Sequence, residues 1–160
     1  MTSSARSEAS RRAWESGEAP DGKHRGIYRK FLHDSNEYSR FVETYRQKVL
    51  TKKTRAVSLP GRKNSARILY TLLGYEVQVA RKRMSCPDSV TARYIRLFSE
   101  LGFSSIQIPC DPTVTAELIP GFETALETLV ARIRKCFPAE RQTYAIRKIY
   151  SIFREQLGAR

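Results

Sequence analysis

Residues 88–101 constrain the fold most, because their apolar side chains recur at helical spacing between residues that begin and end helices. Pro87 suits the first turn of a helix, where its missing N–H is not needed, and Asp88 favours the positive N-terminal end. Gly102 suits the position just after a helix. The pattern predicts a helix whose inward stripe is Val90, Tyr94, Leu97, Phe98 and Leu101.

The same spacing recurs along most of the chain and predicts a mainly α fold. The expected fold class is a compact multi-helix domain with at most one short strand or hairpin. The alternating segment 103–108, which ends before Pro109, is the expected strand. Helices are expected over residues 27–33, 35–51, 68–74, 77–84, 88–101, 122–133 and 138–157.

The N-terminal segment differs from the rest in composition. Residues 1–25 are rich in Ser, Gly, Glu and Arg, which predicts a disordered arm followed by a single α-helical domain over residues 26–160. The segment has no apolar core of a secretory signal, and no apolar run approaches the roughly 20 residues that span a bilayer. We therefore expect a cytoplasmic protein with no transmembrane segment.

Positive charge is concentrated in the middle of the chain. The net charge is +13, and residues 44–99 hold 13 Lys and Arg against two Asp and Glu, a net charge of +11. Residues 44–75 contain eight basic residues and no acidic one. Such a run repels itself and indicates a polyanionic partner, of which nucleic acid is the commonest. An anionic membrane, an acidic protein and a role in solubility are the alternatives.

The order of the expected elements over residues 68–103 resembles a helix-turn-helix, including its winged form. Two helices are followed by a tight break at Cys86 and Pro87, a longer helix, a glycine and a short strand. Ala80 and Val90 match inward positions of that family. The resemblance implies that helix 88–101 enters the major groove of DNA, N-terminal end first. The alternative is a corner of an ordinary helical bundle.

Three groups of residues are candidates for nucleic-acid contacts. The resemblance implies that the expected second helix contacts bases and phosphates through Ser89, Thr91, Arg93 and Arg96. It also implies that the preceding helix contacts the DNA backbone through Arg81, Lys82 and Arg83. The basic run upstream predicts phosphate contacts through Lys48, Lys52, Lys53, Arg55, Arg62, Lys63 and Arg67, with a solvated loop or a nuclear address as alternatives.

The expected function is therefore that of a small basic nucleic-acid-binding protein. DNA is preferred over RNA because of the motif, and the protein would be nucleoid-associated if it binds DNA. Residues 110–157 would supply the core or a homodimer interface. The alternative is a helical interaction or scaffold protein that uses a basic surface on an acidic partner, RNA or a membrane, without sequence readout.

We expect no enzyme activity, because no catalytic constellation is visible. Cys86 stands at an expected helix N-terminus near Arg and Lys, where the pKa of a thiol can be lowered, but no histidine follows it. The histidines, His24 and His33, lie far upstream of Cys86, Cys110 and Cys136 and match no metal-ligand spacing. No metal and no cofactor are expected, and the cysteines are expected to be reduced.

Overall fold

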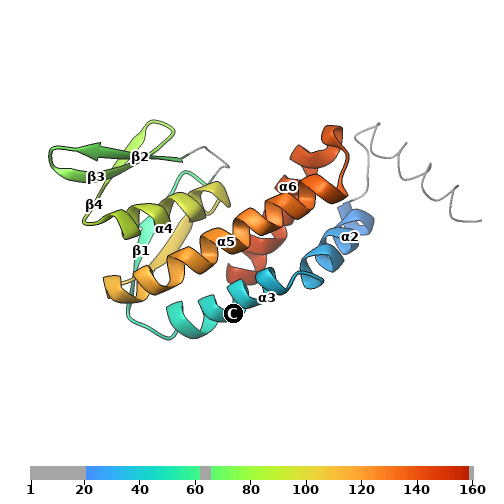
Figure 1. The fold of residues 1–160 in the computed structure, drawn as a ribbon, viewed down its shortest axis with the longest axis horizontal. Coiled ribbons are helices and arrows are strands. Elements are labelled where there is room, and N and C mark those ends of the chain that lie inside the picture. The colour runs from blue at the N-terminus through green and yellow to red at the C-terminus, as the bar shows by residue number, and fades with distance from the viewer. Residues whose placement is uncertain (1–20, 62–65, 159–160) are drawn as a thin grey trace, which may run out of the picture.

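The structure is a computed structural model that describes residues 21–61 and 66–158 (Figure 1). Of the arm predicted over residues 1–25, residues 1–20 lie outside the described part, and the first helix begins at Asp21. The helices are α2 (Asp21–His33), α3 (Asn36–Thr44), the π-helical turn η1 (Tyr45–Val49), α4 (Ser89–Glu100), α5 (Pro112–Cys136) and α6 (Ala139–Gly158). The strands are β1 (Thr54–Ser58), β2 (Ala66–Thr71), β3 (Gly74–Val79), β4 (Lys82–Cys86) and β5 (Ser105–Pro109).

Helix α4 lies between a β-sheet and a layer of helices (Figure 1). On one side it contacts β2 and β3, which belong to an antiparallel sheet of order β2-β3-β4. On the other side it packs against α5, which in turn contacts α3 and α6. A separate ribbon forms where β1 pairs antiparallel with β5, with Thr54 opposite Pro109 and Ser58 opposite Ser105. Both sheets and the helices α3 and α6 therefore pack against α4 or α5.

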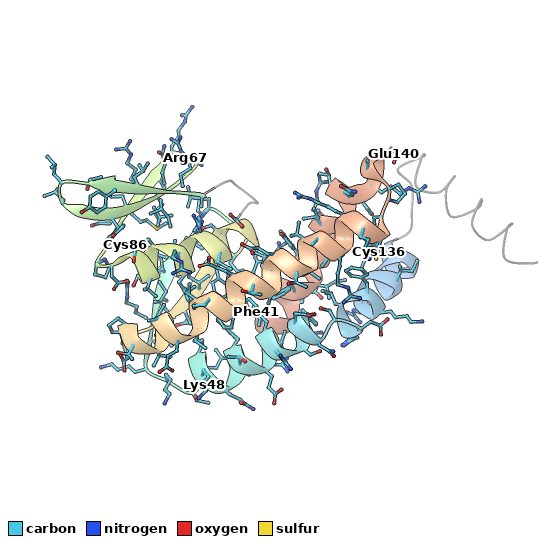
Figure 2. The ribbon with its side chains drawn as sticks, in the orientation of Figure 1. Phe41, Lys48, Arg67, Cys86, Cys136 and Glu140 are labelled. Carbon is cyan, nitrogen blue, oxygen red and sulfur yellow. The ribbon has the colours of Figure 1, made fainter. Side chains whose placement is uncertain are left out.

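The helices meet around Phe41 of α3 (Figure 2). Its ring stacks on Phe122 of α5 at 4.0 Å between centroids and meets Phe153 of α6 edge-on at 4.8 Å. Phe98 of α4 lies at 6.1 Å. Aromatic pairs at these separations add to the stabilisation that burial alone provides. One ring thus joins four helices into a continuous core.

The predicted helix over residues 88–101 is confirmed. The Asp88 side chain caps α4, because its Oδ1 accepts a hydrogen bond from the Thr91 N–H at 2.6 Å. Gly102 follows α4 with a φ of 84°, in the left-handed region that glycine adopts without strain. The predicted strand over residues 103–108 is confirmed as β5, and the Tyr94 hydroxyl donates to the Gln107 carbonyl at 2.8 Å.

The prediction of a mainly α fold with at most one strand or hairpin was wrong. In the described residues, five strands form two antiparallel sheets beside the helices. The helices predicted over residues 68–74 and 77–84 are strands β2, β3 and most of β4. Three strands therefore take the place of the two helices that should precede α4 in a helix-turn-helix over residues 68–103.

The residues of β3 show the alternation that belongs to a strand. Tyr75, Val77 and Val79 point to one face of the sheet, and Val77 and Val79 are completely buried against α4. Glu76 and Gln78 point to the opposite face, which is open to solvent. The period of two in this segment predicts a strand rather than a helix.

Two leucines at the β2–β3 turn account for the error upstream. Ile68, Leu69, Leu72 and Leu73 have the spacing of a helical stripe. In the structure Leu72 and Leu73 form the turn and are almost fully exposed, at 106% and 94% of their reference areas. The helical spacing of these apolar residues therefore did not predict which of them are buried, since two of the four lie in an exposed turn.

Candidate nucleic-acid interface

The basic residues proposed from the sequence do not form one surface. Arg67 belongs to the three-stranded sheet, whereas Lys48 belongs to η1 at the opposite edge of the molecule (Figure 2). A third group, on α4, faces α5. Arg62 and Lys63 lie outside the described residues.

Helix α4 cannot act as a groove-reading helix, because it is covered from two sides. Thr91, a residue expected to contact bases, is 5% exposed, and it is buried together with Ala92, Tyr94, Ile95, Leu97, Phe98 and Ser99. A reading helix needs one long face free for the groove. Ser89 is half-buried in the first turn of α4. Helix α4 therefore lacks the free face that the predicted groove contact requires.

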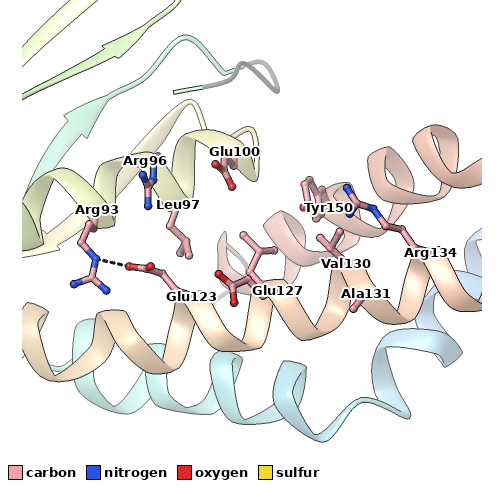
Figure 3. A pocket seen from close by; sticks show the side chains of 11 residues that line it. Arg93, Arg96, Leu97, Glu100, Glu123, Glu127, Val130, Ala131, Arg134 and Tyr150 are labelled. Carbon is pink, nitrogen blue, oxygen red and sulfur yellow. Dashed lines mark hydrogen bonds and ion pairs between the residues drawn. The ribbon is translucent and has the colours of Figure 1, made fainter. Parts of the chain in front are cut away.

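The arginines of α4 form ion pairs with α5 or line the groove between the helices. The Arg93 Nε donates to the Glu123 Oε1 at 2.6 Å. Arg93 and Arg96 line a cavity of about 410 Å³ between α4, α5 and α6 (Figure 3). The charged residues of its wall are balanced, since they are Arg93, Arg96, Arg134, Glu100, Glu123 and Glu127. This balance gives the cavity no preference for a polyanion.

The solvent face of the β2-β3-β4 sheet carries an ordered row of long polar side chains. The register places Gln78 of β3 between Arg67 of β2 and Arg83 of β4. The Arg67 Nη2 donates to the Gln78 Oε1 at 3.3 Å, and the Gln78 Nε2 donates to the Ala80 carbonyl at 3.4 Å. We call Arg67, Gln78 and Arg83 the cross-strand row. Arg67 and Gln78 therefore contact each other across the two strands without a ligand.

A second row lies beside the first on the same face. It consists of Leu69, Glu76 and Ser85, which are aligned across the three strands. The Glu76 Oε2 lies 4.0 Å from the Arg83 Nη1, and this oxygen is buried without a hydrogen-bond partner. The ion pair therefore connects the two rows.

The turn between β3 and β4 adds two cations at one end of the sheet. Arg81 is exposed in the two-residue turn, and the Lys82 Nζ donates to the Ser58 carbonyl of β1 at 3.1 Å. We call Arg67, Arg81, Lys82 and Arg83 the basic sheet end. Residues 66–86 contain these four cations and one acidic residue, Glu76, so the sheet carries a net charge of +3.

The remaining basic residues lie along η1 and β1. Lys48, Lys52, Lys53 and Arg55 are all exposed. Arg55 lies close enough to Cys86 for its charge to oppose the effect of burial, which raises the pKa of that thiol. The lowered pKa considered for Cys86 was therefore wrong, since this cysteine is buried at the end of β4 rather than at a helix N-terminus.

Sequence reasoning missed Gln78, which lies between the two arginines of the cross-strand row and accepts a hydrogen bond from Arg67. The signal was present in Tyr75–Val79, where polar and apolar residues alternate strictly. That alternation places Gln78 on the face opposite Val77 and Val79. What it does not reveal is which strands flank β3, and so which residues become its neighbours.

Comparison with known proteins does not assign the chain. No protein-family model, no curated protein and no solved structure matches it. Within the described residues, no helix is long and apolar enough to cross a membrane, and no three His, Cys, Asp or Glu side chains gather where they could hold a metal ion. The functional conclusion therefore depends on the geometry of the charged surfaces.

Proposed function

We propose that this protein binds nucleic acid through the basic sheet end. The observation that carries the proposal is the position of four cations at one end of the sheet: Arg67 and Arg83 lie on the face opposite α4, Arg81 lies in the turn, and Lys82 lies at the edge on the α4 side. Under this proposal the protein acts in the cytoplasm, and on the nucleoid if the ligand is DNA. A homodimer through residues 110–157 stays a prediction.

The charge distribution favours a polyanion over a role in solubility. Surface charges that serve solubility are usually mixed in sign, because neighbouring like charges repel. Here Arg81, Lys82 and Arg83 are consecutive, and the acidic group that an ion pair places beside them is Glu76 at 4.0 Å from Arg83. The self-repulsion of the basic sheet end would be relieved by phosphates, which would also release condensed counterions.

The size of the surface sets the expected salt dependence. Each phosphate contact contributes about −0.9 to the slope of log K against log salt for duplex DNA, so four contacts predict a slope of about −3.6. Affinity should then fall roughly 100-fold between about 50 and 200 mM salt. The sealed face of the sheet and the charge-balanced cavity beside α4 should contribute little to this slope.

Two variants that each lose three positive charges test the proposal. In the first, Arg67, Arg81 and Arg83 are changed to Ala, and in the second Lys48, Lys52 and Lys53 are changed to Ala. Binding to a fluorescent duplex is measured by anisotropy over a salt series. The sheet variant should lose about 2.7 of the slope, since three phosphate contacts disappear. The control removes three charges from η1 and from the segment before β1, and should change the slope little.

Lys82 is kept in both variants because its Nζ also holds β1 through the Ser58 carbonyl. Equal losses of slope in the two variants would show diffuse attraction to the whole surface and would contradict the proposed site. The absence of binding to DNA and RNA at low salt would reject the function itself. Circular dichroism of both variants confirms that the fold is retained.

A further inference from the structure

We propose that the cross-strand row reads base pairs in the major groove of duplex DNA. The inference rests on the proposed function and adds the kind of nucleic acid and the mode of reading. Arg67, Gln78 and Arg83 would face the base edges, while Arg81 contacts a phosphate at the groove wall. In this mode the variant with Arg67, Arg81 and Arg83 changed to Ala loses about 0.9 of the salt slope instead of about 2.7. Lys82 lies opposite Val79 on the α4 side of the sheet, where its Nζ donates to the Ser58 carbonyl. The element that enters the groove is thus the sheet, and α4 supports it from behind.

The dimensions of the sheet fit the groove. Neighbouring strands lie about 4.8 Å apart, so the row of three side chains spans roughly 10 Å. The major groove of B-DNA is about 12 Å wide and admits an α-helix or a two-stranded β-ribbon, and the row of side chains is narrower than the groove. Because α4 covers one face, β2, β3 and β4 can present only the face that carries Arg67, Gln78 and Arg83.

The chemistry of the row matches base edges. Arginine donates two hydrogen bonds to guanine O6 and N7, and glutamine pairs with adenine N6 and N7. Arg67 uses one of its five N–H donors on Gln78 and keeps the others for a ligand. Glu76 forms an ion pair with Arg83 at 4.0 Å, and its Oε2 is buried, so this carboxylate positions Arg83 beside the row. This face therefore offers two guanidinium groups and one side-chain amide to base edges.

The row is ordered before binding. Gln78 accepts a hydrogen bond from Arg67 at 3.3 Å and donates one to the Ala80 carbonyl at 3.4 Å, and Arg83 lies 4.0 Å from Glu76. Side chains that are already fixed lose less rotamer entropy when they bind. The ordering therefore favours readout of bases over loose attraction to phosphates, for which flexible lysines suffice.

Single strands and duplex RNA fit this face less well. Single-strand binders stack bases on aromatic rings, but both tyrosines of the sheet, the exposed Tyr70 and the half-buried Tyr75, point to the face opposite the cross-strand row. Duplex RNA has a deep and narrow major groove that side chains cannot read. Duplex DNA is thus the ligand that the solvent face of the sheet can read.

The test is selection from a random-sequence duplex library, followed by affinity measurements on the selected site. Wild type should enrich a short motif, and should bind its duplex more tightly than duplex RNA or single-stranded DNA of the same sequence. The variant Gln78→Ala should lose preference at one position of the motif, by roughly 5- to 150-fold, with an unchanged salt slope. The variant Arg81→Ala should lower the salt slope by about 0.9 and keep the motif.

The outcomes separate the two proposals. If the triple sheet variant lowers the salt slope but no motif is enriched, the phosphate-binding function stands and base readout fails. Equal affinity for duplex RNA or single strands, or a motif that Gln78→Ala leaves unchanged, also overturns the readout. If no nucleic acid binds at low salt, both proposals fail. The variants Gln78→Ala and Arg81→Ala leave the buried face of the sheet intact, so we expect both to stay folded. Circular dichroism checks this.

Discussion

At the scale of single residues, the backbone of Ala80 is the feature that most needs an explanation. It has a φ of 55°, and within the described residues it is the one non-glycine residue in the left-handed region. A two-residue hairpin turn with positive φ at its first position is normally built with glycine. Alanine there is strained by about 1–2 kcal/mol, because its Cβ crowds the following carbonyl. The strain lies beside Arg81, at the end of the sheet that we propose binds phosphates.

The change Ala80→Gly should stabilise the protein by about 0.5–1 kcal/mol, since relief of strain exceeds the entropy gained by the unfolded chain. Chemical denaturation measures this. The same substitution at Ala131, an exposed position inside α5, should destabilise by about 1 kcal/mol. Destabilisation in both variants would show that the Ala80 backbone is not strained.

At the scale of elements, α4 acts as a packing element rather than a reading element. Its capping by Asp88 and its apolar stripe could be predicted from the sequence, because both are local. The sequence could not predict that α4 is enclosed by other elements, because its apolar stripe identifies only one buried face. Residues outside the stripe, such as Thr91 and Ile95, are also buried, since α4 is packed on two sides by the sheet and α5.

The pair Arg93–Glu123 connects α4 to α5, so Arg93→Ala should lower the free energy of unfolding by about 1 kcal/mol. The salt slope of nucleic-acid binding should stay unchanged, because this arginine faces the cavity wall. The control Arg29→Ala removes the longer, half-exposed pair with Glu155 and should cost less than about 0.5 kcal/mol. A loss of sequence preference in Arg93→Ala would restore α4 as a reading helix.

At the scale of the whole molecule, the core contains tyrosines whose ionisation opposes folding. Burial raises the pKa of Tyr38 to about 12, and burial followed by the Glu100 charge raises that of Tyr150 to about 12. In the unfolded chain these groups ionise near pH 10. Above that pH the unfolded state releases protons that the folded state keeps, so the free energy of unfolding decreases as pH rises.

Stability should therefore be insensitive to these tyrosines below pH 10 and should decrease between about pH 10 and 12, by about 1.4 kcal/mol per pH unit for each tyrosine. Denaturation at a series of alkaline pH values measures this decrease. In the variant Tyr38→Phe, the free energy of unfolding should decrease less steeply with pH, by about 1.4 kcal/mol per pH unit. An unchanged steepness would show that Tyr38 ionises equally well in the folded state.

The sequence by itself determined what depends on near neighbours: the caps and extent of α4, the strand β5, and the concentration of charge in residues 44–99. Only the tertiary structure decided that residues 66–86 form a sheet and that α4 is enclosed by it. The reason is physical. A helix repeats contacts three and four residues apart, whereas a sheet depends on pairing between strands, and Ile68 to Leu73 satisfied a helical spacing by coincidence at an exposed turn. The pairing of these strands also determined that Arg67 and Arg83 lie on either side of Gln78.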